Sequence, residues 1–259
     1  MTLQRVALVG WPAAGAVPTE KAGRVGYAVG LVVLRWNDSL QEHAAMHDDK
    51  TVSANRSRFD ALAAQWDSPE HQHRAAAFLE ALQARGIKLA GRTVLEYGCG
   101  TGLLTVLLAK EADRVLAVDI SAGMLAQLGR KIATQGIDSI TICEADLVAQ
   151  PLDGVTCDLV VCAMVLHHVA DVSAILTHFH AMLGPGGQLA ILDLDADGGR
   201  FHGKEAEGVA HHGFERAALE ALVHQAGFDA VEIATAHAMP KEDETFTIFL
   251  LTAHKPPVS

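Results

Sequence analysis

Cysteine is scarce in this sequence: four cysteines occur among 259 residues, at positions 99, 143, 157 and 162. No two of them have the Cys-x-x-Cys spacing of a redox or zinc motif. Three of them lie inside apolar runs that we expect to be buried strands. Because free, buried thiols are typical of a reducing compartment, we expect a cytoplasmic protein.

Basic residues are outnumbered, with 20 Lys and Arg against 31 Asp and Glu and a net charge of -11. A negative field repels phosphate backbones and anionic lipid surfaces. The sequence shows neither a stripe of alternating aromatic and basic residues nor an Asn-Pro-Pro-Tyr-type motif after the fourth predicted strand. We therefore expect neither a nucleic acid nor a membrane as partner.

No apolar run is long enough to cross a bilayer, which takes about 20 residues in a helix. A run at residues 25–34 falls far short of that length. Residues 6–17, which follow Arg5, loosely imitate a signal peptide, but Gly, Trp and Pro residues interrupt the apolar stretch. We expect neither a membrane span nor secretion.

Composition divides the chain into three parts. Residues 1–45 are rich in Gly, Ala, Val and Pro without a sustained period, and we predict an irregular N-terminal extension there. Two interpretations of this extension stay open. Either the natural start is Met46, so that the extension is non-native or a disordered arm, or the extension forms a loosely packed extra helix. Residues 46–90 are predicted to form a helical N-terminal lid segment, and residues 91–259 a ligand-binding α/β domain.

From Ser68 onward the sequence alternates between helix and strand patterns. Ser68 can cap a helix whose first turn holds Pro69, and Gly86 can end it. Nearly continuous Val, Leu and Ile runs then alternate with helical stretches, as in a parallel sheet covered on both faces. We predict strands at residues 93–96, 114–118, 140–143, 158–162, 188–192, 230–235 and 246–252, and further helices at residues 102–110, 121–136, 171–184 and 215–226.

These elements predict an α/β fold with a Rossmann-like, mostly parallel seven-stranded sheet and helices on both faces. A short polar loop joins the last two strands, which are expected to pair antiparallel and so give the sheet an antiparallel C-terminal strand.

The first predicted strand runs into three glycines at alternate positions, Gly98, Gly100 and Gly102. Glycines allow a ligand to approach the backbone closely at the start of a helix. The run is not the Gly-x-Gly-x-x-Gly fingerprint of dinucleotide sites, because position 103 is Leu, and it lacks the Lys-Ser/Thr ending of a phosphate-binding loop. The glycines alone are weak evidence, so the neighbouring strand ends decide the interpretation.

The second predicted strand ends at Asp119, 17 residues beyond Gly102. A carboxylate at that place can accept both hydroxyls of a ribose. The third strand is followed by Asp146, an acid for an exocyclic amine, and by Leu147, an apolar side chain for a ring face. Because these strand ends meet at one edge of the sheet, they predict an adenosine-shaped site.

From about Phe59 to Pro256 the chain resembles the class I S-adenosylmethionine-dependent methyltransferases. The run Glu96-Tyr97-Gly98-Cys99-Gly100-Thr101-Gly102 is similar to the first motif of that family. The resemblance implies S-adenosyl-L-methionine as cofactor, with the glycine run at its methionine part, Asp119 at the ribose and Met124 beside the adenine. The cofactor-binding residues that it implies are Glu96, Tyr97, Gly98, Cys99, Gly100, Gly102, Asp119, Ile120, Met124, Asp146, Leu147, Ala163 and Met164.

Residues 59–67 and 166–169 resemble signatures of small-molecule methyltransferases. The implied function is methyl transfer to a small-molecule acceptor by in-line displacement. Many relatives place Tyr where Trp66 lies, so an indole changes that contact to N–H donation or simple coverage. The alternatives are a cofactor-binding regulatory module without turnover and a protein methyltransferase. Polar signatures of the ubiquinone and menaquinone enzymes are absent, which leaves the acceptor open. The sequence shows no heptad repeat and no interface patch, so the oligomeric state is open as well.

An acceptor that must lose a proton needs a base, and the candidates are His168, His211 and His212. The alternative is that these histidines pack locally or are solvated. The loops after the fifth strand also carry Asp193, Asp195, Asp197 and His202. No His-x-x-x-His or Glu-x-x-His spacing organises these residues, so we predict no metal site.

Overall fold

The computed structural model describes residues 34–35, 49–149, 151–203 and 206–257. The predictions for residues 1–33 and 36–48, including the start at Met46, lie outside the described residues. Within the described residues, no helix has the length and apolar character needed to cross a bilayer.

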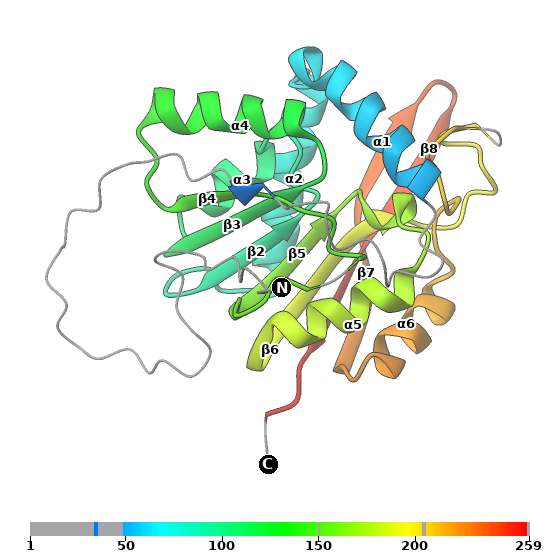
Figure 1. Ribbon diagram of the computed structural model, residues 1–259. Helices are drawn as coiled ribbons and strands as arrows, with labels where there is room; N and C mark the ends of the chain where they lie inside the picture. The colour runs from blue at the N-terminus through cyan, green and yellow to red at the C-terminus, as the bar shows by residue number, and fades with distance from the viewer. Residues whose placement is uncertain (1–33, 36–48, 150, 204–205, 258–259) are drawn as a thin grey trace, which may run out of the picture.

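The protein is built on a mixed sheet with the strand order β1-β4-β3-β2-β5-β6-β8-β7 (Figure 1). The predicted seven-stranded, mostly parallel arrangement is confirmed, and β8 is the strand that runs antiparallel to both of its neighbours. One correction is needed: a two-residue strand within the predicted irregular extension pairs with β4 and makes an eighth strand. The strands are β1 (Leu34–Arg35), β2 (Thr93–Tyr97), β3 (Arg114–Asp119), β4 (Ile140–Glu144), β5 (Cys157–Ala163), β6 (Leu183–Leu194), β7 (Asp229–Lys241) and β8 (Glu244–His254).

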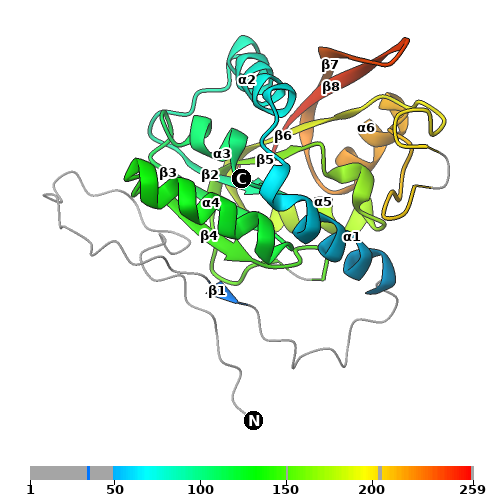
Figure 2. The same ribbon diagram turned by 90° about the horizontal axis from the view of Figure 1, so that it is seen from above.

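Helices cover both faces of the sheet, as Figures 1 and 2 show. The helices α2, α3 and α4 pack on one face and α5 and α6 on the other, because strand residues alternate between two separate apolar clusters. The α-helices are α1 (Asp49–Leu62), α2 (Pro69–Ala84), α3 (Leu103–Leu108), α4 (Ala122–Gln135), α5 (Val172–Met182) and α6 (Arg216–Gln225), and two short 3-10 helices are η2 (Ala63–Gln65) and η3 (Leu166–His168).

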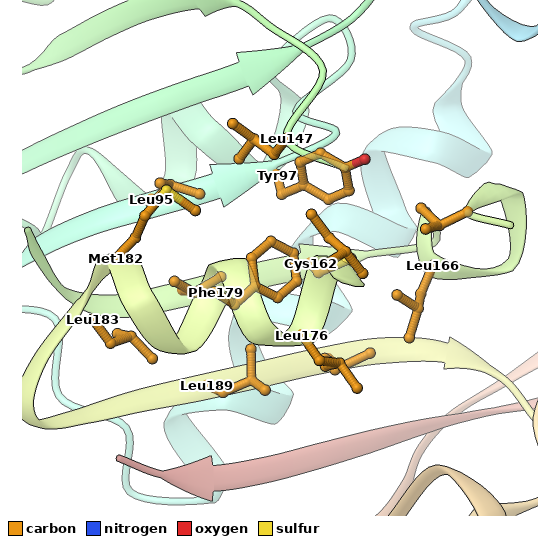
Figure 3. Close-up of a cluster of buried hydrophobic side chains, with 14 of the residues drawn as sticks. Leu95, Tyr97, Leu147, Cys162, Leu166, Leu176, Phe179, Met182, Leu183 and Leu189 are labelled. Atoms are coloured by element: carbon orange, nitrogen blue, oxygen red, sulfur yellow. The ribbon is translucent and has the colours of Figure 1, made fainter. Parts of the chain in front are cut away.

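An apolar cluster lies between α5 and the sheet. Phe179 of α5 is fully buried and meets the ring of Tyr97 edge-on, with 5.4 Å between the ring centroids. Leu147, Cys162 and Leu176 belong to the same cluster (Figure 3). This packing fixes the end of β2, and therefore the place where the glycine run begins.

The predicted capping residues act as expected at the N-termini of the helices. Ser68 Oγ accepts a hydrogen bond from the backbone N–H of His71 at 3.2 Å, and Ser121 Oγ accepts one from Met124 at 3.1 Å. Gly136 ends α4 in the left-handed conformation, with a φ of 65°. These local signals explain why the helix boundaries were predictable.

The hairpin of β7 and β8 extends well beyond the strands that the sequence predicts. Its distal residues Met239 and Phe246 are paired and are buried in the cluster that also holds Phe78 of α2. Arg74 of α2 also donates a hydrogen bond to Met239 Sδ at 3.4 Å. Because contacts with α2 stabilise the hairpin, its length depends on packing that no local pattern contains.

We predict that Gly102→Ala destabilises the protein far more than Gly136→Ala. Both glycines have positive φ values, but a Cβ at Gly102 meets Leu128 Cδ1 at 2.3 Å, whereas a Cβ at Gly136 meets nothing within 4 Å. The strain of a left-handed conformation costs about 1 kcal/mol in both variants, and overpacking adds about 2 kcal/mol for Gly102. Urea unfolding of both variants measures the difference, and equal losses of stability would contradict the packing argument.

Candidate functional site

A cavity lies at the carboxyl edge of the sheet, where β2, β3 and β5 end. Eleven of the thirteen predicted cofactor-binding residues line it. The helical segment before β2 contributes an opposite wall that includes Phe59, Trp66 and Phe78. The predicted residues that line the cavity are Glu96, Tyr97, Gly98, Cys99, Gly100, Asp119, Ile120, Met124, Asp146, Ala163 and Met164.

Gly102 and Leu147 lie outside the lining of this cavity. Gly102 precedes α3, where Leu128 of α4 fills the space next to its Cα. Leu147 is fully buried on the α5 side of the sheet, close to Tyr97 (Figure 3). Both residues therefore support the site through packing.

Asp119 joins the two loops that follow β2 and β3. Its Oδ2 accepts a hydrogen bond from the backbone N–H of Gly100 at 2.8 Å, and its Oδ1 accepts one from Ser121 at 2.9 Å. Burial raises the pKa of Asp119, and the backbone hydrogen bonds oppose that rise. The carboxylate thus fixes the glycine loop against the start of α4.

Glu96 presents a buried polar atom to the same cavity. The residue is 3% exposed, and its Oε2 has no hydrogen-bond partner among the described residues. Burial raises the pKa of Glu96 to about 8, the neighbouring Thr105 hydroxyl opposes the rise, and the nearby charge of Asp119 adds to it. A buried acceptor of this kind fits a ligand that brings a hydrogen-bond donor or a positive charge.

Asn55 of α1 is a second buried polar residue at the cavity, which the sequence analysis missed. It is 4% exposed and lines the cavity, and its Oδ1, which lacks a hydrogen-bond partner among the described residues, lies against Gly208. Arg74 and His71 of α2 line the cavity as well. No motif marks these three residues, because they reach the cavity only through the placement of the helices that precede β2.

Two aspartates tie the segment at residues 59–67 to the edge of the sheet. Asp60 Oδ1 accepts hydrogen bonds from Ser121 Oγ at 2.6 Å and from the backbone N–H of Gly123 at 2.7 Å. Asp67 Oδ1 accepts a hydrogen bond from Thr101 Oγ1 at 2.5 Å, and its Oδ2 lies 2.7 Å from Lys131 Nζ. The segment therefore forms a wall of the cavity that is held at both ends.

The side chains of that wall are aromatic. The rings of Phe59 and Trp66 meet edge-on with 5.6 Å between centroids, and Phe59 meets His168 at 5.4 Å. The indole nitrogen of Trp66 lies 4.0 Å from the position that a Cβ on Gly100 would take. An aromatic wall so close to the glycine loop can cover a ligand and exclude water.

The three predicted base candidates differ in position. His168 lines the cavity, and its Nδ1 donates a hydrogen bond to the carbonyl of Gly208 at 2.7 Å. Burial and the neighbouring His167 lower the pKa of His168 to about 3. His211 donates a hydrogen bond to the carbonyl of Val169, and neither His211 nor His212 is among the residues that line the cavity. Only His168 of the three is placed to meet a ligand there.

The structure also brings together His167, Asp193 and His202. His167 Nδ1 lies 2.7 Å from Asp193 Oδ1, and both side chains are buried. His167 Nε2 lies 3.1 Å from His202 Nε2. The sequence analysis named Asp193 and His202 as loop residues. It did not relate His202 to His167, because 35 residues separate these two histidines and no spacing rule connects them.

Comparison with known proteins identifies the family of the chain. A family model described as a methyltransferase domain matches residues 47–233. An uncharacterized methyltransferase of Schizosaccharomyces pombe is 31% identical over 139 residues, which cover 49% of this chain and 49% of that protein. A ubiquinone biosynthesis O-methyltransferase of Pseudomonas paraeruginosa is 30% identical over 142 residues, which cover 52% of this chain and 60% of that protein.

Among solved structures, the DhpI-SAH complex is similar with a TM-score of 0.65 and 25% identity, over 82% of this chain and 100% of that one. The matches to the two curated relatives extend over about half of the length of those proteins. The family model covers most of the chain and includes the glycine run, Asp119 and the strand ends that line the cavity. The chain therefore belongs to the family of class I S-adenosylmethionine-dependent methyltransferases.

Proposed function

We propose that this protein transfers the methyl group of S-adenosylmethionine to a small-molecule acceptor. One observation carries the proposal: a single cavity joins the glycine loop, two buried carboxyl groups and an aromatic wall, at the edge of the sheet where Rossmann-like folds bind their ligands. Glu96 supports it further, because the unpaired Oε2 suits a cationic ligand with N–H donors.

The cofactor, when bound, supplies a methyl group on a sulfonium, which is already a strong electrophile. Glu96 and the backbone of Gly98 and Gly100 would hold its methionine part, and Asp119 its ribose hydroxyls. Met124 and Asp146 would contact the adenine. Each of these residues lines the cavity in the structure, which supports the assignment made from the sequence.

The remaining task of the chain is to position the acceptor and to exclude water. Alignment of two reactants in a closed site can supply about 7–11 kcal/mol of the barrier reduction. Phe59 and Trp66 form an apolar wall for an acceptor, and Asp60 and Asp67 hold that wall in place. A concave cavity with such a wall fits a small molecule better than an extended protein segment.

Polar groups on the wall can orient the acceptor. Asn55 of α1 and Arg74 of α2 both line the cavity, so an amide and a guanidinium group are near a bound acceptor. His168 is neutral at physiological pH, but a pKa of about 3 makes it a weak base. His168 is therefore better suited to accept a hydrogen bond from an acceptor than to remove its proton unaided.

We predict that Asp119→Ala weakens binding of S-adenosylmethionine at least about tenfold, which corresponds to about 1.4 kcal/mol. The variant loses the ribose contact and frees Gly100 from its carboxylate partner. Asp158→Ala is a matched control, because Asp158 also accepts a backbone hydrogen bond, from Thr93, but lies at the opposite edge of the sheet. Calorimetric titration gives both affinities, and thermal unfolding shows whether each variant is folded.

An Asp119→Ala variant that is folded and binds the cofactor like the wild type would contradict the site assignment. A folded wild type without affinity for S-adenosylmethionine or S-adenosylhomocysteine would contradict the proposed function as a whole. Binding without turnover against a broad panel of acceptors would instead favour the regulatory alternative.

We also predict that binding of S-adenosylmethionine near pH 6.5 releases protons from Glu96. The pKa of about 8 leaves this carboxyl group largely protonated in the free protein at that pH. A bound cation lowers the pKa, so the group ionises on binding. The release falls as the pH rises through about 8 and vanishes only well above it, where the group is already charged in the free protein. Titration in buffers of different ionisation enthalpy measures the protons, with Glu96→Gln as the control that releases fewer. Equal release by both proteins would refute the prediction.

A further inference from the structure

Three histidines gather beside the cofactor cavity: His167 and His168 from η3, and His202 from the loop after β6. One ring nitrogen of each can be chosen so that all three lie within 4.8 Å of one another. The ring centroids are 4.2 Å apart for His167 and His168, and 5.0 Å apart for His167 and His202. His168 also lines the cavity, so the cluster adjoins the place where an acceptor would bind.

Hydrogen bonds fix two of these imidazoles in one orientation. His168 Nδ1 lies 2.7 Å from the carbonyl oxygen of Gly208, and since a carbonyl only accepts, Nδ1 carries the proton and Nε2 a lone pair. His167 Nδ1 lies at the same distance from the buried carboxylate of Asp193, which leaves a lone pair on Nε2, and this nitrogen accepts a hydrogen bond from His202 Nε2 when no ion is bound. A histidine that binds a metal through one nitrogen typically donates its other N–H to a carboxylate or a backbone carbonyl.

The spacing of the nitrogens also suits a metal. His167 Nε2 and His202 Nε2 are 3.1 Å apart. In a tetrahedral zinc site with Zn–N bonds of about 2.0–2.1 Å, two ligand nitrogens lie roughly 3.3 Å apart. His202 is on a loop and partly exposed, so its ring can turn toward an ion while the buried His167 stays in place.

The charged groups around the cluster include some that favour a bound cation and some that oppose it. The Asp193 carboxylate is fully buried against His167 and offsets part of the charge of a bound cation. Asp197 also interacts with His202, whereas Arg58 and Lys241 oppose a cation there. The balance favours a site of neutral imidazoles with one buried carboxylate behind them, rather than a cage of acids suited to magnesium or calcium.

We propose that His167, His168 and His202 bind one zinc ion, with Asp193 and the Gly208 carbonyl orienting two of the ligands. Three protein ligands leave a coordination position open, as in catalytic zinc sites. An acceptor hydroxyl or thiol bound at that position would lose its proton more readily, because the metal stabilises the anion. This inference goes beyond the proposed function, and metal binding is testable without turnover.

The test uses the full, untagged chain, because a histidine tag would itself bind zinc. The protein is stripped with a chelator and titrated calorimetrically with Zn²⁺, and Co²⁺ serves as a second probe whose visible absorption reports a tetrahedral site with nitrogen ligands. We expect one ion per chain. His202→Gln should weaken binding at least about tenfold, because one of three ligands is lost. His202 is chosen because His167 and Asp193 are buried and their variants could fail to fold.

His224→Gln is the matched control, since His224 is about half exposed on α6 and lies outside the cluster. Its affinity for Zn²⁺ should equal that of the wild type. A folded wild type that binds no stoichiometric ion, or equal affinities of the His202 variant and the wild type, would overturn the proposal. Titration of the same samples with S-adenosylmethionine keeps the two proposals apart, because cofactor binding without zinc binding would refute only the metal site.

Discussion

The Asp119 carboxylate holds the site together. It accepts hydrogen bonds from the backbone N–H groups of Gly100 and Ser121, which belong to loops after two neighbouring strands. A buried carboxylate is costly unless such bonds satisfy it, so the glycine loop and the start of α4 must stay where they can supply them. The cavity, the wall segment at residues 59–67 and the glycine run all depend on this arrangement.

The segment at residues 59–67 follows from the same constraint. Asp60 binds Ser121 and Gly123 at the start of α4, and Asp67 binds Thr101 and Lys131 beside the glycine loop. The wall of the cavity is thus attached to the groups that Asp119 positions. Under the proposed function, an acceptor would contact α1, η2 and α2, whereas the cofactor would contact the carboxyl edge of the sheet.

Buried polar groups distinguish the functional edge from the rest of the core. Glu96 brings an unpaired buried oxygen to the cavity, and His167, His168 and His202 bring ring nitrogens to its border. Asp119, which is also buried, lies at the carboxyl end of β3 beside them. A buried polar group without a partner costs free energy. The concentration of such groups at one edge is therefore consistent with ligands that supply the missing hydrogen bonds or charges.

The sequence by itself determined the order of strands and helices, the caps of α2 and α4, and the strand ends at Glu96 and Asp119 that line the cavity. Hydrophobic period, capping residues and glycine spacing are local properties, so they can be found in the sequence. The tertiary structure alone decided that β1 joins the sheet, that α2 stabilises the long hairpin, and that Asn55 lines the cavity. It also decided that His202 meets His167, because helices and loops distant in sequence come together only when apolar faces pack. No local pattern encodes such contacts.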